Sequence, residues 1–393
     1  MVKREYRTTF VLVTSLFFIW GFTRAIMDVL NKHFQTELGI SISQSTWMQV
    51  AFFLGYFLFA LPAGRFITRY GYRNGVVFGL SLFGMGALAF GVWAAFGGSV
   101  NLSLFYFFLL ALFVIACGLV VLETAANPYV TLLGNRETSA SRLNFAQSFN
   151  GLGNICGPWI GGMLLFSGGD ADITLPYILL GMVVFLVALV FSRVKLPEIQ
   201  EEEWVNPEVK ENKGLWHHRL FVFGFIALLF YEIAEISINS LFVNYAESAH
   251  GIDKLSASQW LSFGFVLFMV ARFVGSWLMS KLKAEKVLLG CAIGTVMSNI
   301  LVFINIGMIS LIALMLNFVF EAIIFPTIFS LALQDLGNLT KKGSAVLMMS
   351  TIGGAIGTWL MGTIADQTTL SFAFIVPLIG YLVVLAYSIK VSR

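Results

Sequence analysis

The sequence VVLETAANPYVTLLG, residues 120–134, places an ionisable side chain inside a segment with the character of a membrane helix. The apolar run LSLFYFFLLALFVIACGL, residues 102–119, comes directly before it. Glu123 therefore lies well within a hydrophobic stretch, and Asn127 and Pro128 follow about one helical turn later. A charged side chain near the centre of a membrane helix costs at least ~2.5–3.5 kcal/mol if it faces lipid. This cost indicates that Glu123 has a specific role.

The composition is that of a membrane protein. Of the 393 residues, 58% are hydrophobic and 11% are charged, whereas soluble proteins average roughly 45–50% apolar and about 25% charged residues. The net charge of +3 comes from basic residues scattered through the loops, which excludes a nucleic-acid-binding surface. Cys117, Cys156 and Cys291 all fall in apolar runs without the spacing of metal ligands. We therefore expect neither a metal site nor a cofactor.

The hydrophobic pattern predicts an all-α membrane protein with twelve transmembrane helices. Each predicted span exceeds the ~20 residues that are needed to cross the hydrocarbon layer. The predicted spans are 8–34, 45–69, 74–97, 102–134, 141–167, 173–194, 217–247, 256–281, 285–307, 309–336, 343–365 and 371–391.

The loops predict the orientation and the division of the chain. Most lysine and arginine residues fall on one side of the predicted spans, which marks that side as cytoplasmic and places both termini there. The longest polar stretch predicts a cytoplasmic linker, 195–216, between two six-helix bundles, 1–194 and 217–393. We expect a multi-pass protein of the cell (inner) membrane. We also expect a monomer, because one chain already contains both bundles.

The two bundles repeat one another weakly. The pattern Glu-x4-Pro occurs at Glu123 and Pro128 and again, in the tenth span, at Glu321 and Pro326. Two copies of a six-span unit are a known plan for secondary transporters, whose site lies between the halves near the middle of the membrane. Aligning the first and seventh spans in the same way matches Arg24 with Glu235 and Asp28 with Asn239.

Seven ionisable residues fall in the interior of the predicted spans, away from the span ends, and each must form an ion pair, line a water-filled cavity or be neutral. They are Arg24, Asp28, Glu123, Glu232, Glu235, Arg272 and Glu321. Acids outnumber bases, so some acids must hold a proton for part of the time, as a proton-coupled transporter requires. The alternative is a structural role in hydrogen bonding. Glu321 fits that alternative best, because its own span offers few polar neighbours, and Arg272 fits a role in helix packing.

Polar residues also follow helical faces. Trp20, Arg24 and Asp28 recur every four residues in the first span, as Glu123 and Asn127 do in the fourth. The spacing leaves open whether Arg24 pairs with Asp28 or reaches an acid on another span, Glu123 or Glu235.

The fifth span carries a stripe of amides at Asn144, Gln147, Asn150 and Asn154, all within one helical arc. Amides both donate and accept hydrogen bonds, which suits a polyhydroxylated ligand such as a sugar. The alternative is that the amides join neighbouring helices by hydrogen bonds.

Three segments resemble a known family: LETAANPYVTLLG at 122–134, RLNFAQSFNGLG at 142–153 and FFIWGFTRAIMD at 17–28. They are similar to the fucose–galactose–glucose:proton symporters of the major facilitator superfamily. The resemblance implies alternating access and proton-driven import of a monosaccharide. It implies that Asp28 and Glu123 are the proton-coupling pair, that Gln147 and Asn150 contact sugar, and that Glu235 corresponds to an acid of the seventh helix.

The sequence departs from that pattern at Arg24, Ala25 and Met27, where fucose-type members carry polar amides, and this favours a hexose such as glucose or galactose over fucose. We predict a sugar importer with protons as the coupling ion and lipid as its surroundings. Sodium coupling, an uncoupled facilitator and an exporter stay open; no HExxH or GxSxG motif suggests an enzyme. The candidate sugar-binding residues are Gln147, Asn150, Asn144, Asn154, Arg24, Asn127, Trp20, Glu235 and Asn239.

Overall fold

The computed structural model is almost entirely helical in the residues that it describes, with short turns between the helices. These are residues 6–38, 47–97, 102–166, 174–194, 196, 214–252, 254–334 and 336–393. Backbone groups in lipid must find their hydrogen bonds within the chain, and a helix satisfies them locally. The predicted all-α fold class is confirmed.

The N-terminal half, residues 6–194, contains α1 (Arg7–Leu38), α3 (Trp47–Gly97), α4 (Leu102–Leu132), α5 (Ser139–Phe166) and α6 (Thr174–Arg193). Helix α3 holds two of the predicted spans. The helical path is interrupted between them at Gly71, whose φ of 81° and ψ of 170° suit only glycine. The predicted gap between residues 69 and 74 is thus a sharp corner rather than a loop.

The C-terminal half, residues 214–393, has more interruptions. It contains α7 (Arg219–His250), α8 (Lys254–Met279), α9 (Ala284–Ile304), α10 (Met308–Glu321), α11 (Ile324–Ala332), α12 (Thr340–Met348), α13 (Ile352–Gln367), α14 (Leu370–Ala373) and α15 (Ile375–Ser392). The tenth predicted span is broken between α10 and α11, next to Pro326. The eleventh begins earlier than predicted, at Thr340, and passes from α12 to α13 through a 3₁₀ turn at Met349–Thr351.

The number of spans agrees with the prediction within the described residues. Nine segments are long and apolar enough to cross a membrane, and one of them, Trp47–Phe96, makes two passes around Gly71. Helices α5 and α6 complete the twelve. The boundaries of the two bundles at 194 and 217 stay a prediction, because most of the predicted linker lies outside the described residues.

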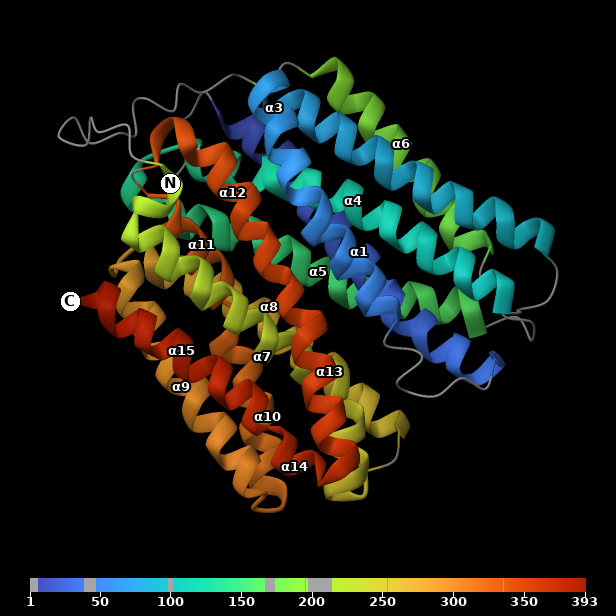
Figure 1. Cartoon of the computed structure of the whole chain (residues 1–393), viewed down its shortest axis with the longest axis vertical. Helices are drawn as coiled ribbons and strands as arrows, with labels where there is room; N and C mark the ends of the chain where they lie inside the picture. Colours follow the sequence, from blue (N-terminus) through green and yellow to red (C-terminus); the bar gives the residue numbers. More distant parts are fainter. Residues whose placement is uncertain are drawn as a thin grey trace.

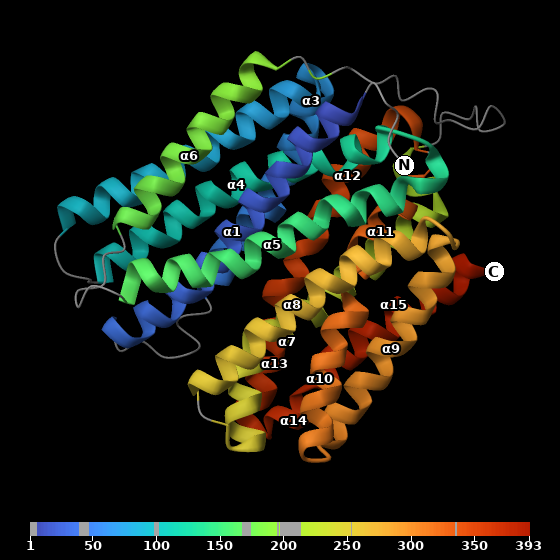
Figure 2. The same cartoon turned by 180° about the vertical axis from the view of Figure 1, so that it is seen from behind.

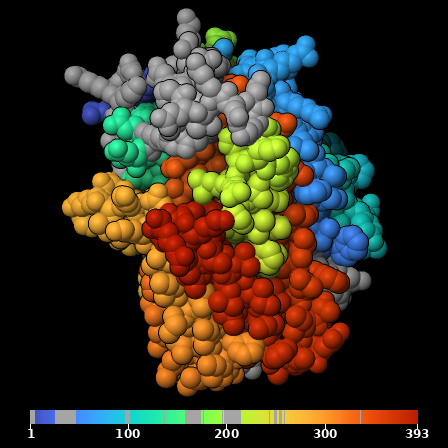
Figure 3. Space-filling view, turned by 60° about the vertical axis from the view of Figure 1, so that its left-hand side comes forward, coloured from blue at the N-terminus to red at the C-terminus, as the bar shows by residue number. Residues whose placement is uncertain are grey.

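The helices form two groups that lie side by side (Figures 1 and 2). In one group α3 packs on α4 and α6, and α1 packs on α5; in the other, α7 packs on α13 and α15, and α15 packs on α9. The orange and red surface of α9 and α15 is continuous in Figure 3. Glycines permit the closest approaches. A Cβ atom at Gly153 would clash with the carbonyl of Phe18 on α1, and one at Gly357 with that of Ile233 on α7.

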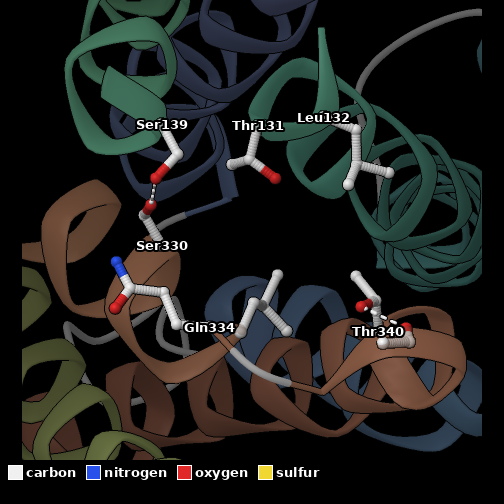
Figure 4. Close-up of a pocket in the computed structure, with 8 residues that line it drawn as sticks. Thr131, Leu132, Ser139, Ser330, Gln334 and Thr340 are labelled. Carbon is white, nitrogen blue, oxygen red and sulfur yellow. Dashed lines mark hydrogen bonds between the residues drawn. The ribbon is translucent and has the colours of Figure 1, made fainter. Parts of the chain in front are cut away.

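The halves meet through α5 and α8 and through α3 and α12. We call the end of the molecule at which α4 ends and α5 begins the linker end. There the Ser139 and Ser330 hydroxyls, 2.9 Å apart, join α5 to α11 beside a small pocket (Figure 4). The pocket is lined by Thr131, Leu132, Ser139, Ser330, Leu333, Gln334, Gly337 and Thr340, none of which is a predicted sugar-binding residue.

Candidate functional site

Glu123 is buried in the second half of α4, with 2% of its surface exposed. The hydroxyl of Tyr56, from the first pass of α3, donates a hydrogen bond to Glu123 Oε1. Arg24 of α1 and Glu232 of α7 lie close enough to interact with the carboxyl group electrostatically. The predicted acid therefore lies where three helices of one half face a helix of the other.

A pair of amides lies one turn along α4. Gln147 Nε2 of α5 donates to Asn127 Oδ1 at 3.1 Å. Arg272 of α8 donates through Nη1 to the Gln147 carbonyl at 2.9 Å and to Gln147 Oε1 at 3.2 Å. All three side chains are at most 5% exposed. The structure thus brings Gln147 and Asn127 together beside Glu123, and it ties them to the opposite half.

The rest of the amide stripe divides into two parts. Asn144 Nδ2 bonds the Ala140 carbonyl at 2.9 Å and Thr327 Oγ1 of α11 at 3.2 Å, so this residue makes the interhelical bonds of the alternative interpretation. At the other end, Asn154 Nδ2 donates to Asn150 Oδ1 at 3.2 Å. These two amides bond each other and leave further donor and acceptor positions for a ligand.

The first helix contributes Trp20 and Arg24, both half-buried. Trp20 packs against Phe17 with ring centroids 6.0 Å apart. Arg24 acts electrostatically on both Glu123 and Glu232, and the choice among the three pairings left open for it stays a prediction. The side chain of Asp28 lies outside the described residues, so its predicted role stays a prediction.

The seventh helix contributes Glu235 and Asn239. Glu235 is 8% exposed and interacts electrostatically with Arg272 and Glu321, both in its own half. Asn239 is half-buried, and its Oδ1 has no hydrogen-bond partner among the described residues. A buried acceptor without a donor is a natural contact for a ligand hydroxyl.

Glu321, the counterpart of Glu123 in the repeat, has a different environment. It is fully buried, and its Oε2 accepts from the Tyr381 hydroxyl and from Asn317 Nδ2 at 2.6 Å. Asn317 is itself bonded to Asn299 at 2.9 Å. The expectation of few polar neighbours in its own span was wrong, because Asn317 lies one turn earlier on the same face. The structural role inferred from that expectation fits the observed network.

Sequence reasoning missed Tyr56 and underestimated Arg272. Tyr56 lies in an apolar run with no pattern that marks it, and only the packing of α3 on α4 reveals its contact with Glu123. For Arg272, the sequence leaves a role in helix packing as one open alternative. Its bonds to Gln147 and, through Nε, to the Ala322 carbonyl at 2.7 Å show that it connects the two halves.

Comparison with known proteins shows the family of the chain. The profile of the Major Facilitator Superfamily matches residues 12–358. A glucose/galactose transporter of Brucella abortus is 35% identical, over 100% of this chain and 96% of that protein. An L-fucose-proton symporter of Haemophilus influenzae is 33% identical, over 99% and 98%.

Solved structures give the same result. The crystal structure of the transporter FucP in the outward conformation superposes with a TM-score of 0.86 at 30% identity, covering 99% of this chain and 100% of that one. The proton:xylose symporter XylE, at 13% identity, shares the fold with a TM-score of 0.77 over 98% and 95% of the two chains. This protein is therefore a member of the Major Facilitator Superfamily, in the family of the glucose/galactose transporters and L-fucose-proton symporters.

Proposed function

We propose that the protein imports a hexose, glucose or galactose rather than fucose, in symport with protons by alternating access of its two halves. The observation that carries the proposal is the position of Glu123. This desolvated acid lies one turn from the Asn127–Gln147 amide pair and faces Glu232 of the other half. The relatives named glucose/galactose transporter and L-fucose-proton symporter support the substrate class and the coupling ion.

The burial of Glu123 supplies a physical reason for coupling. An ionised carboxylate in a dry, low-dielectric interface is costly, whereas the protonated acid is not. Closure of the halves around the site therefore favours a proton on Glu123, and opening to the other side lets the proton leave. Asp28, which the family resemblance pairs with Glu123, is proposed as the second proton-coupling residue.

Gln147, Asn150, Asn154 and Asn127 are proposed to bind the hydroxyl groups of the sugar. Asn239, whose Oδ1 has no partner in the described part of the chain, is proposed to bind the sugar from the opposite half, and Trp20 is proposed to pack against the ring. We place the linker end on the cytoplasmic side of the inner membrane, with both termini, because basic residues concentrate in its loops. We propose a monomer with no cofactor.

Uptake of labelled glucose, galactose and fucose into proteoliposomes tests the proposal. We expect glucose or galactose to accumulate when the outside is acidic, and we expect a protonophore to abolish the accumulation. Accumulation driven by a sodium gradient would show that sodium, rather than the proton, is the coupling ion. Exchange of sugar without accumulation would show an uncoupled facilitator. If none of the three sugars exchanged, the substrate class would be wrong.

A further inference from the structure

The two proline residues of the repeat each leave a backbone carbonyl without its usual helical donor. Proline has no N–H group, so Pro128 cannot bond the carbonyl of Thr124, and Pro326 cannot bond that of Ala322. A buried carbonyl without a partner is unfavourable, so a side chain is expected at each position. In the structure, both carbonyls accept from side chains that lie at the interface between the halves.

Ala322 lies at the break between α10 and α11, and Arg272 is its donor. Arg272 Nε bonds the Ala322 carbonyl at 2.7 Å, while Nη1 bonds the carbonyl and the side chain of Gln147 in the other half. The guanidinium group also lies over the ring of Phe268, 4.3 Å from its centroid. Arg272 is 5% exposed, so these contacts hold it away from water.

The planar guanidinium group suits this task. Its donors point in fixed directions, so a bond from Nε to one helix determines where Nη1 points. Here the bond to Ala322 directs Nη1 toward Gln147. A lysine ammonium group, on a flexible stem, would keep the charge but lose this fixed geometry.

The bond from Arg272 also determines how the amide of Gln147 is turned. An amide has one accepting oxygen and one donating nitrogen. Because Arg272 occupies Oε1, the Nε2 group faces Asn127 Oδ1, to which it donates at 3.1 Å. If the bond to Arg272 were absent, the amide could turn over and present the wrong group to Asn127 and to a ligand.

We propose that Arg272 is the positioning residue that fixes the Gln147 amide for hexose binding and links that amide to the helix break at Pro326. This inference rests on the proposed function and adds a residue that acts through Gln147 rather than on the sugar directly. The bond to Ala322 lies within the C-terminal half, whereas the bonds to Gln147 cross between the halves. Separation of α5 from α8 must therefore release Gln147 from its positioning group.

Hexose counterflow by Arg272→Lys tests the proposal, because this exchange needs no proton gradient. A charge-assisted hydrogen bond contributes enough that we expect the half-saturating hexose concentration to rise about tenfold or more. The maximal rate should stay within about twofold of the wild type. Pro326→Ala, which returns an N–H group to the Ala322 carbonyl and loosens the anchor of Arg272, should raise the same concentration about threefold.

A double variant and a control make the result specific. In Gln147→Ala, the further change Arg272→Lys should have no additional effect on half-saturation, because the two residues act as one unit. Ser276→Ala removes a neighbouring contact on α8, the Ser276–Ser141 bond between the halves, without touching Gln147, and should leave half-saturation unchanged.

Unchanged half-saturation in Arg272→Lys, or full additivity with Gln147→Ala, would overturn the inference. Size-exclusion chromatography shows whether Arg272→Lys is folded. If it is not, an unchanged half-saturating hexose concentration in Pro326→Ala would overturn the inference. A wild type that exchanges no hexose would instead reject the proposed function.

Discussion

Glu123 and Glu321 occupy equivalent places in the two halves, yet they differ in which half supplies their neighbours. Each is five residues before a proline, and each accepts a hydrogen bond from a tyrosine hydroxyl, Tyr56 for Glu123 and Tyr381 for Glu321. The neighbours of Glu123 include Arg24 and a second acid, Glu232, across the interface. Glu321 also has an acid and an arginine nearby, Glu235 and Arg272, but these residues and its bonded partners Asn317 and Tyr381 all belong to its own half.

This difference shows how one repeated motif can serve two purposes. A group that exchanges protons must meet different neighbours as the halves move, and only Glu123 interacts with an acid of the opposite half. The network around Glu321, formed with Asn317 and Tyr381, lies within one half, so movement of the halves relative to each other need not change it. We infer that the motif supplies a buried acid in both halves and that its packing decides whether the acid couples transport or stabilises a bundle.

The largest expected effect is that of Glu123→Gln on concentrative uptake. Glutamine keeps the size and can still accept from Tyr56, but it cannot carry a proton. We expect accumulation under a proton gradient to fall by about a hundredfold or more, because coupling needs a titrating group, while counterflow persists. Uptake measured with and without the gradient checks this, and undiminished accumulation would contradict it.

The next effect concerns stability and belongs to Glu321. Glu321→Ala leaves Asn317 and Tyr381 without their shared acceptor, so we expect the free energy of unfolding to fall by about 3 kcal/mol, the combined effect of two buried bonds. Glu321→Gln keeps an acceptor and should cost less than half as much. Thermal unfolding of the purified protein measures both, and equal stability of all three proteins would refute the structural role.

A smaller effect is expected for Tyr56→Phe, which removes the donor to Glu123 and nothing else. Loss of one hydrogen bond of about 1–1.5 kcal/mol corresponds to roughly tenfold in a rate. We therefore expect maximal proton-driven uptake to fall about tenfold while sugar affinity is kept. Tyr381→Phe is the matched control in the other half, and its uptake should stay within about twofold of the wild type.

The smallest effect is expected at the carbonyl of Thr124. Pro128 cannot supply the usual helical N–H donor to this carbonyl. Ser344 of α12, in the opposite half, donates to it instead at 3.1 Å. Helix α4 runs on through Pro128, whereas the chain is broken next to Pro326. Ser344→Ala should weaken the contact between halves by about 1 kcal/mol. This weaker contact should let the halves separate more often at the linker end. A cysteine introduced there in place of Ser330 should therefore react with a thiol reagent about threefold faster when Ser344→Ala is also present than when it is absent.

The span layout and the acid of α4 could be predicted from the sequence for a physical reason. Exposing a polar side chain to lipid is costly, so few polar residues occur in an apolar run without a specific role. Glu123, Gln147 and Asn127 therefore stand out in the sequence. The structure adds that the helix face shared by Glu123 and Asn127 meets the amide stripe of α5, where Gln147 donates to Asn127.

The contacts between helices could not be predicted in the same way. Tyr56 is one hydroxyl in a run of aromatic residues, and nothing in its sequence context names Glu123 as its partner. The roles of Arg272 and Asn144 likewise depend on which helix of the other half lies opposite them. Such partners follow from the packing of α5 on α8 and α11, which sequence periodicity leaves undetermined.

Sugar-driven proton movement in the paired variants Glu123→Gln and Glu321→Gln tests the central claim most directly. Proteoliposomes without an imposed gradient are given glucose or galactose, and the external pH is followed. We predict that wild type and Glu321→Gln make the outside more alkaline as sugar enters, whereas Glu123→Gln, although it still exchanges sugar, gives no pH change. Alkalinisation by Glu123→Gln, or its loss only in Glu321→Gln, would show that the wrong acid has been assigned to coupling.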